Sequence, residues 1–454
     1  MEKVKNRGWS VATAGIGINL ALGILYTWSM FKMAIKDSIV AGDGRFDWSL
    51  SSLNDPYAVC CLAFAFSMIF AGRLQDKFSP RITALIGGVL TGLGLMWISQ
   101  SYSLWVWILG FGVLTGTGLG FGYASATPPA IKWFPAAKTG LIAGLVVSGF
   151  GLASVYIAPL SSYLIHTVGL SAAMMIFGGA FIVVVCGLSQ FLVNPPAGYS
   201  PEAKPAGSAA VQAKGLDFAP SAMLRTKSFY LLWFTYFVGA GAGLMIIGNV
   251  AGMAKASLGD MAWVVVALMA VGNAGGRIVA GILSDKIGRT QTLAIMLCFQ
   301  SLLLFSLMMV GKEQAIVMVM AAALVGFNYG TNLSLFPSAT KDYFGLKNFG
   351  VNYGLVFTAW GVGGFVLPRV SQMIVAATGS YESAYLTAAV LLILGAGMTV
   401  VLDKPVSVEA EAPVPQPAAA PRAGSALTSM VRPGPLATGR PGLGHRSSYR
   451  RMIK

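Results

Sequence analysis

The sequence has 454 residues, of which 56% are hydrophobic and only 10% are charged. Ordinary globular chains carry roughly 25% charged residues, so this composition excludes a soluble protein and fits a chain whose surface faces lipid. The net charge of +15 could indicate a nucleic-acid partner, but the distribution of the basic residues argues against one. The four cysteines lie in apolar stretches without metal-ligand spacing, which predicts neither a disulfide framework nor a metal site.

Twelve segments are long and apolar enough to cross a bilayer, which takes about 20 mostly apolar residues. They are residues 8–31, 56–75, 82–101, 104–127, 138–165, 171–193, 228–250, 261–284, 290–311, 314–337, 349–375 and 381–402. They predict an all-α membrane protein with an N-terminal six-helix half (1–193) and a C-terminal half (228–402). Residues 194–227 are expected to form a cytoplasmic loop between the halves. Residues 403–454, rich in Pro, Ala, Gly and Arg, are expected to be a disordered cytoplasmic tail.

The Lys and Arg residues predict the orientation. With the N-terminus inside, the cytoplasmic segments hold 24 of the 31 basic residues. The outer loops hold Lys32, Lys36, Arg45, Lys255 and Lys312, and two more, Arg277 and Arg369, lie within spans. This asymmetry follows the positive-inside rule and accounts for the basic charge without any nucleic acid. We therefore expect a multi-pass protein of the cell inner membrane with both termini in the cytoplasm.

The two halves repeat one another in sequence. Gly72-Arg-Leu-Gln-Asp76-Lys77 follows the second span, and Gly281-Ile-Leu-Ser-Asp285-Lys286-Ile-Gly-Arg289 follows the eighth, at an offset of 209 residues. Gly120-Phe-Gly-Tyr123 matches Gly326-Phe-Asn-Tyr329, and Leu145-Val-Val-Ser-Gly-Phe150 matches Leu355-Val-Phe-Thr-Ala-Trp360. Because each half has an even number of spans, the repeat is parallel.

The loop motif resembles the Gly-x-x-x-Asp-Lys/Arg-x-Gly-Arg signature of the major facilitator superfamily, which implies that fold. The second copy matches fully, whereas the first has Ser79-Pro80 where Gly-Arg is expected. An Asp at a helix end can pair with an Arg or with the N-terminus of a neighbouring helix. We expect Asp76, Asp285, Lys286 and Arg289 to act in the conformational switch.

Glycine is abundant, with 56 residues, but no Gly-Lys-Ser/Thr motif is present, which argues against ATP binding. Close helix packing accounts better for glycines within spans. Transport would then be driven by a solute or ion gradient. No nucleophile–base pairing or metal cluster points to an enzyme, and we expect no cofactor and no metal.

Arg277 is the clearest functional candidate, because an ionisable group at membrane depth is costly. It lies about 12 Å from the cytoplasmic end of span eight, and Asn273 lies one turn earlier on the same face. No Asp or Glu lies in the core of any span. An unpaired guanidinium favours an anion, and a carboxylate has the matching two-pronged geometry. The alternative is a snorkelling or purely structural Arg.

Polar and aromatic residues occur where a central cavity would need them. The candidates that orient a carboxylate are Asn19, Tyr26, Tyr123, Asn328, Tyr329 and Tyr353, and those that form cavity walls are Phe150 and Trp360. Taken singly, each could instead serve helix packing.

The segment from Gly326 to Pro337, together with Asp342–Asn348 and Asn352-Tyr-Gly354, resembles the oxalate/formate antiporter family. So do Tyr26-Thr-Trp-Ser-Met-Phe31 and Asn194-Pro-Pro-Ala-Gly-Tyr199. That family is allied to the monocarboxylate transporters, and the resemblance implies a substrate-binding Arg where Arg277 stands.

Two departures from those families bear on substrate and coupling. The dicarboxylate antiporter has a Lys in span eleven where this chain has Trp360, so a single cation favours a monocarboxylate such as L-lactate, pyruvate or formate. Proton-linked monocarboxylate transporters have an Asp where this chain has Asn273. The resemblance still implies proton symport, with Asp260, a group near the outer gate or the substrate itself as the proton carrier.

The leading hypothesis is therefore a monomeric secondary transporter that moves a small carboxylate anion together with a proton by alternating access. The second is an organic-anion exchanger of the oxalate/formate type. A third, a membrane sensor without transport, has no signalling domain to support it.

Overall fold

The computed structural model describes residues 6–135, 138–196, 199, 217–251, 254, 258–308, 315–345, 347–378 and 382–402. Within its helices a few side chains, that of Asp76 among them, are not described. The predicted tail at 403–454 and residues 197–198 and 200–216 of the predicted loop between the halves lie outside the described residues. Every regular element in the described ranges is helical.

The first half of the chain contains spans one to six. Span one is α1 (Gly8–Leu22), the 3-10 helix η1 (Gly23–Thr27) and α2 (Trp28–Ala41); span two is η2 (Leu50–Asn54) and α3 (Asp55–Lys77). Span three is α4 (Pro80–Ile98), and span four is α5 (Leu104–Trp107), the π-helix η3 (Ile108–Thr115) and α6 (Gly116–Lys132). The last helix is α7 (Thr139–Ser189).

Helix α7 contains both the fifth and the sixth predicted span. It has 51 residues, and Gly169 interrupts it with φ 85° and ψ 164°. This conformation is open to glycine but strongly disfavoured for residues with a Cβ atom. The chain turns there, at the point between the predicted spans 138–165 and 171–193.

The second half contains spans seven to twelve. After the short α8 (Pro220–Met223) come α9 (Lys227–Ile247), η5 (Gly259–Ala262), α11 (Trp263–Ile287), α12 (Arg289–Leu307), α13 (Ala315–Phe344), α14 (Phe349–Thr378) and α15 (Glu382–Val400). Eleven helical segments of the described residues are long and apolar enough to span a membrane, and α7 counts as two. The predicted all-α fold of twelve spans in two six-helix halves is confirmed.

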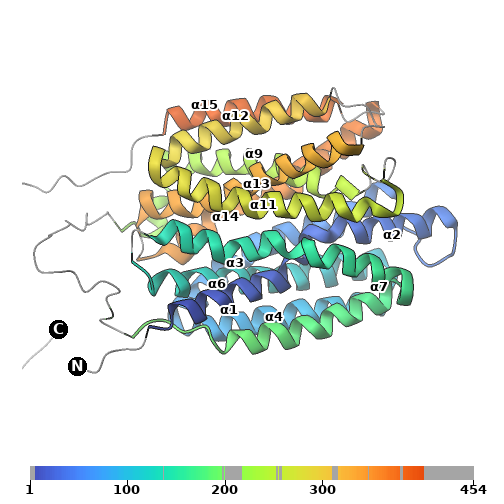
Figure 1. Ribbon diagram of the computed structural model, residues 1–454, viewed down its shortest axis with the longest axis horizontal. Helices are drawn as coiled ribbons and strands as arrows, with labels where there is room; N and C mark the ends of the chain where they lie inside the picture. Colours follow the sequence, from blue (N-terminus) through green and yellow to red (C-terminus); the bar gives the residue numbers. More distant parts are fainter. Residues whose placement is uncertain are drawn as a thin grey trace, which may run out of the picture. The chain divides into compact units, whose positions relative to one another are not determined.

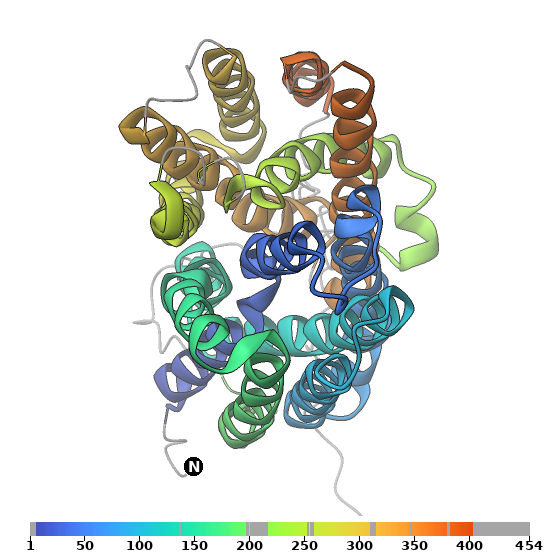
Figure 2. The same ribbon diagram turned by 90° about the vertical axis from the view of Figure 1, so that its right-hand side faces the viewer.

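The two halves form two groups of helices side by side (Figure 2). Across the boundary, α3 packs on α14 and α7 packs on α11. Within the second half, α11 lies against α13, and a Cβ atom at Gly276 would collide with the backbone of Phe327. Glycine at this position allows the backbones to approach closely, as is usual for helices in lipid. The contact places α11 and α13 side by side where the candidate site lies.

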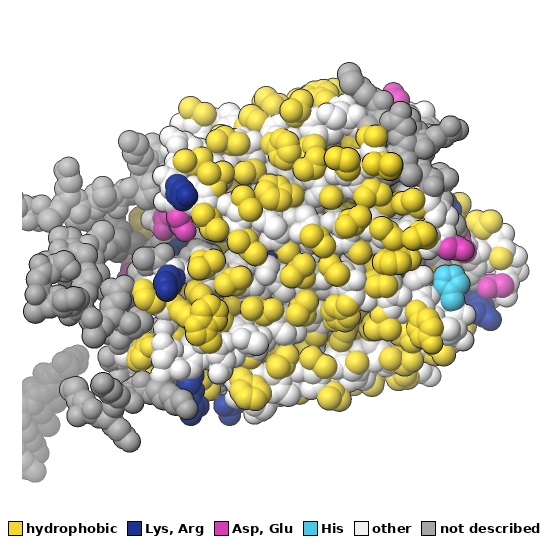
Figure 3. Space-filling model, viewed as in Figure 1, with side chains coloured by type: hydrophobic (Ala, Val, Ile, Leu, Met, Phe, Trp, Pro, Cys, Tyr) yellow, Lys and Arg dark blue, Asp and Glu magenta, His cyan; other side chains and the backbone are white. Residues whose placement is uncertain are grey.

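The surface in Figure 3 is hydrophobic along the middle of the bundle, and charged side chains gather toward its two ends. Large apolar residues such as Trp105, Val183 and Phe70 are more than 60% exposed, which suits contact with lipid rather than water. We call the end with the α3–α4, α6–α7, α11–α12 and α13–α14 connections, at the left of Figure 1, the basic end. It carries Arg73, Lys77, Lys132, Lys286, Arg289, Lys341 and Lys347.

Candidate functional site

Arg277 lies on α11 with 0% of its surface exposed. Its Nε donates to Asn273 Oδ1 at 2.9 Å, and its Nη2 donates to the Tyr26 hydroxyl at 3.4 Å. Its Nη1 donates to the backbone carbonyl of Val147 on α7. All three acceptors are neutral, and none of the ion pairs among the described residues includes Arg277. The bundle therefore surrounds this guanidinium with dipoles but gives it no described counter-ion.

The remaining hydrogen-bonding capacity of Arg277 suits an anion. A guanidinium has five N–H groups, and its three contacts leave two of them, both on the Nη atoms, without a described acceptor. A carboxylate can accept from two parallel N–H groups and would also compensate the buried charge. Binding such an anion is therefore the chemistry that this arrangement favours.

A chain of hydroxyl groups links Arg277 to both halves of the protein. The hydroxyls of Tyr26, on η1, and Tyr329, on α13, lie 2.7 Å apart, and Trp360 Nε1 on α14 donates to the Tyr329 oxygen at 2.7 Å. Only one of the two phenol protons is needed for the Tyr26–Tyr329 bond. The other remains available for an oxygen atom of a ligand.

Aromatic rings surround this chain. Phe150 packs edge-on against Tyr26 with ring centres 5.1 Å apart, and its ring centre lies 5.5 Å from that of Tyr123. Phe64 on α3 contacts Phe150, Tyr123 and Trp360, at 5.1 to 5.7 Å between ring centres. Phe64 was not among the predicted site residues, although the repeat offset of 209 residues makes it the equivalent in the first half of Asn273 in the second. These rings shape an apolar wall beside the guanidinium.

The structure brings together six of the predicted site residues, which are Arg277, Asn273, Tyr26, Tyr329, Trp360 and Phe150. We call these six the arginine layer. A small pocket with an empty volume of about 230 Å³, lined by Tyr26, Ser154 and Asn273 among others, lies on its side away from the basic end. A larger cavity, with an empty volume of about 710 Å³ including its open mouth, lies on the side of the basic end.

Tyr123 and Tyr353 lie in the wall of the larger cavity, and Tyr123 also packs against Phe150 of the layer. Tyr123 and Tyr353 both pack against Phe357, with ring centres 5.8 and 5.6 Å apart. Neither hydroxyl has a hydrogen-bond partner within the described structure. They are placed to meet a molecule in the cavity.

Two predicted site residues have other neighbours. Asn19 is fully buried and donates to the carbonyl of Val146 at 2.8 Å, next to the carbonyl that accepts from Arg277. Asn328 donates to the carbonyl of Met296 and to Gln300 Oε1, both on α12, at 2.7 and 2.6 Å. Asn19 therefore joins α1 to α7, and Asn328 joins α13 to α12, away from the layer.

Two of the three predicted switch residues of the second half, Asp285 and Arg289, meet in one network at the basic end. Arg289 pairs with Asp285 at 2.6 Å and with Asp342 at 3.0 Å, and it also donates to the Ser284 hydroxyl. The network joins α11, α12 and α13 within the second half. Lys286 is exposed, and among the described residues it takes part in no ion pair. The side chain of Asp76 lies outside the described structure, so its role stays a prediction.

At the end opposite the basic end, polar contacts join the two halves. Lys32 on α2 donates to Asn249 Oδ1 at 2.7 Å and to the carbonyl of Gly248 at 3.1 Å. Arg369 on α14 pairs with Asp55, at the start of α3, at 3.2 Å. The sequence places Lys32 in an outer loop and Arg369 within a span, without a partner for either. They contact the opposite half instead, because span ends that look isolated in sequence face each other in the bundle.

The sequence profile of the Major Facilitator Superfamily matches residues 10–368 and, in a second alignment, 233–444. The chain belongs to this superfamily. Its solved member FucP, in the outward conformation, superimposes with a TM-score of 0.57 at 16% identity, covering 85% of this chain and 98% of FucP. At that identity the likeness concerns the fold alone.

Some of its curated relatives have names that state a carboxylate substrate. The oxalate:formate antiporter of Oxalobacter formigenes is 27% identical over 359 residues, or 78% of this chain and 81% of the relative. Human monocarboxylate transporter 11 is 26% identical over 403 residues, or 86% of this chain and 81% of the relative. The chain is thus a multi-pass membrane transporter of this superfamily, similar to carriers of small carboxylates.

Proposed function

We propose that this transporter carries a small monocarboxylate such as L-lactate or pyruvate together with a proton across the inner membrane. Both termini and the basic end would lie in the cytoplasm, as the positive-inside rule indicates. The carboxylate would bind Arg277, with Asn273, Tyr26 and Tyr329 orienting it and Trp360 and Phe150 forming the wall.

The observation that carries this proposal is that Arg277 is buried without a described counter-ion. The side chain is fully buried, its three described hydrogen-bond acceptors are neutral, and two N–H groups remain for a ligand. A buried charge without a counter-ion is costly, and an arriving monoanion relieves that cost. The binding energy of the anion would thus come largely from completing an unfinished ion pair.

Trp360 supports a monoanion over a dianion. It is 0% exposed, and its indole N–H is already used by the Tyr329 hydroxyl. A second carboxylate bound near it would find a neutral ring and would remain buried without a cation. Charge matching in the arginine layer therefore favours a substrate with one negative charge.

The contacts between the halves support alternating access. Lys32 and Asp55 of the first half hold Asn249 and Arg369 of the second at the far end, whereas the large cavity lies toward the basic end. This is the arrangement expected of an inward-facing state, in which the halves have rocked together on the outside. Asp260 is exposed on η5, so Asp55, at the contact between the halves, is the better candidate for an outer group that takes up a proton.

Uptake of radiolabelled L-lactate into proteoliposomes tests the proposal. Uptake should rise when the outside is made acidic relative to the inside, because the proton gradient then drives the anion inward. Arg277→Ala should reduce uptake at least about a hundredfold, since it removes two charge-assisted hydrogen bonds to the substrate. Arg277→Lys, which keeps the charge but loses the two-pronged geometry, should be only partly active.

The controls separate loss of binding from loss of fold. Gel-filtration profiles and thermal unfolding of the purified variants should match those of the wild type before any uptake is compared. Wild-type uptake by a correctly folded Arg277→Ala would disprove the assignment of the site, whichever anion is carried.

The exchanger hypothesis is favoured by the similarity to the oxalate:formate antiporter. It predicts that labelled formate enters vesicles preloaded with unlabelled formate or oxalate in the absence of any pH gradient, while net uptake into empty vesicles is absent. Gradient-driven uptake into empty vesicles would rule out obligatory exchange.

A further inference from the structure

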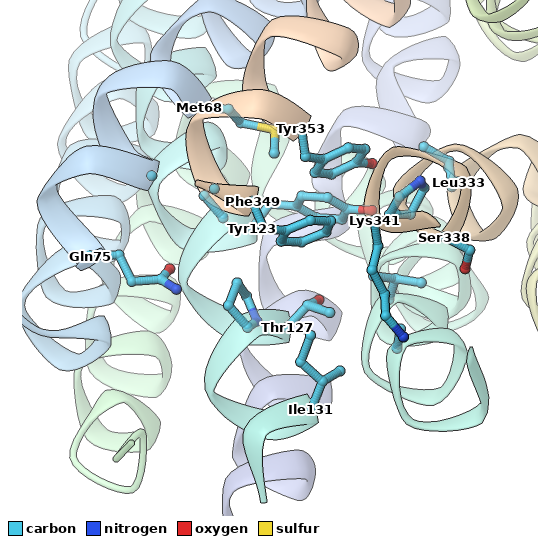
Figure 4. Close-up of a pocket in the computed structure, with 17 residues that line it drawn as sticks. Met68, Gln75, Tyr123, Thr127, Ile131, Leu333, Ser338, Lys341, Phe349 and Tyr353 are labelled. Atoms are coloured by element: carbon cyan, nitrogen blue, oxygen red, sulfur yellow. The ribbon is translucent and has the colours of Figure 1, made fainter. Parts of the chain in front are cut away.

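The large cavity contains polar groups that the arginine layer does not use. Its lining includes Lys341 on α13, Gln75 on α3, Thr127 and Tyr123 on α6, and Tyr353 on α14. Figure 4 shows Gln75 and Lys341 on two sides of this cavity, with Thr127 between them. One cation and four polar side chains from both halves of the protein thus surround a single space.

Most of these polar groups lack a partner. Gln75 Oε1, Thr127 Oγ1 and the hydroxyls of Tyr123 and Tyr353 are buried atoms without a hydrogen-bond partner among the described residues. Gln75, Tyr123 and Tyr353 are themselves 3%, 4% and 7% exposed. Buried polar groups in proteins are nearly always satisfied, so a cluster of unsatisfied ones around a cavity indicates a ligand or ordered water.

Lys341 gives this cluster its charge. It is half-buried, and the ion pairs described for its neighbourhood join Arg289 to Asp342 and Asp285 but do not include Lys341. It lies 12 residues after Tyr329 on the same helix, roughly 18 Å along the axis. The cavity therefore has a cation of its own, well separated from the arginine layer.

We propose that the cavity holds a second anion site, in which Lys341 binds a carboxylate and the polar groups of Gln75, Thr127, Tyr123 and Tyr353 line the space around it. The inference rests on the proposed carboxylate transport and deepens it. The site receives the anion on the cytoplasmic side of Arg277, so that a substrate leaving the arginine layer passes from one cation to another. Because Lys341 is only half-buried, this site is weaker than that of Arg277 and releases the anion readily.

Protection of an introduced cysteine tests this site directly. Ala143 lines the same cavity and is half-buried, so Ala143→Cys places a thiol beside the proposed anion. The rate at which N-ethylmaleimide modifies this position is followed by peptide mass spectrometry, which separates it from the four native cysteines. The purified full-length protein is assayed with sodium L-lactate or sodium formate, against sodium chloride at equal ionic strength.

At a carboxylate concentration of three times its dissociation constant, about a quarter of the cavities remain empty. We therefore expect the carboxylate to slow the modification about fourfold. This protection should persist when Arg277 is changed to Gln, which removes the cation of the arginine layer. It should be lost in Lys341→Gln and restored in Lys341→Arg. Lys347→Gln is the matched control, because Lys347 is an exposed basic-end lysine outside the cavity lining.

The outcomes separate this inference from the proposed function. Protection that disappears in Arg277→Gln, persists in Lys341→Gln, or is absent with both carboxylates overturns the second site. Protection that depends on Lys341 supports the site even if the uptake experiments show that Arg277 is dispensable. If Arg277→Ala loses uptake while neither carboxylate protects the cysteine at position 143, the proposed function is supported and only the second site is overturned.

Discussion

The hydroxyl of Tyr26 lies 2.7 Å from that of Tyr329, and this bond joins the first half of the protein to the second directly beside Arg277. Tyr26 belongs to η1, where the first span changes from α-helix to 3-10 helix, and Tyr329 belongs to α13. Because Arg277 of the second half donates to Tyr26 of the first, an anion that displaces this bond changes a contact between the halves. On the proposed function, substrate binding and movement of the halves would be coupled through the same atoms.

The Tyr26–Tyr329 pair gives the first prediction. Tyr329→Phe removes the oxygen shared by Tyr26 and Trp360, so the KM for L-lactate should rise roughly tenfold, the cost of about one hydrogen bond to a buried polar network. Tyr230→Phe is the matched control, because Tyr230 is 59% exposed on α9. An unchanged KM in Tyr329→Phe would show that the hydroxyl does not take part in binding.

The charge in the arginine layer gives the second prediction. Trp360→Lys adds a second cation opposite Arg277, so uptake of oxalate relative to L-lactate should rise about tenfold or more, because both charges of the dianion then have partners. Trp360→Leu enlarges the cavity without adding charge and should leave the preference for L-lactate in place. Equal substrate ratios in the two variants would show that charge matching does not set selectivity.

The ion pair between Asp55 and Arg369 gives the third prediction. Asp55→Asn should weaken the outer contact between the halves and increase the outward-facing population about two- to fivefold, since a partly exposed pair contributes up to about 1 kcal/mol. Spin labels at Val40 and Met373, both 71% exposed near this end, report the change as a longer distance in electron–electron resonance.

A charge swap tests the same pair more strictly. Asp55→Arg alone and Arg369→Asp alone should both shift the distance distribution, and the double variant should restore the wild-type distribution. A double variant that behaves as the sum of the two single variants would show that the residues do not interact.

The Arg289 network gives the fourth prediction. Arg289→Ala removes the pairing with Asp285 and Asp342, which should lower the melting temperature by a few degrees and slow transport about two- to fivefold. Arg225→Ala, an exposed change near the same end, serves as the control. If transport slows without any loss of thermal stability, the network acts on the conformational change itself, as the sequence motif predicts.

Much of the fold follows from the sequence because each span carries its own signal. Residues 82–101 and 290–311, for example, are apolar along a length that crosses a bilayer, and the structure has α4 (Pro80–Ile98) and α12 (Arg289–Leu307) there. In lipid the backbone must satisfy its own hydrogen bonds, so an apolar run of this length has few options besides a helix. The break at Gly169 is likewise visible as the gap between two predicted spans.

The candidate site followed from the sequence only in part. Arg277 stands out because a charge within an apolar run is costly, and Asn273 lies one turn away on the same helix, where the structure finds its hydrogen bond. Asn328 and Tyr329 are adjacent in sequence and point to different neighbours, one toward α12 and the other toward Tyr26. Sequence spacing alone does not tell which of two neighbouring polar residues faces the centre of a bundle.

The sequence by itself determined the number of spans, the repeat and the buried cation, and it predicted the orientation, because each depends on local hydrophobicity and charge. Only the tertiary structure decided that Tyr26 meets Tyr329, that Asp55 meets Arg369, and that Lys341 shares a cavity with Tyr123 and Tyr353. These pairs lie between 12 and more than 300 residues apart, and their contact depends on how each helix is rotated and tilted against its neighbours. Packing of small residues across the helix interfaces sets those angles, and it acts only once all the helices are in place.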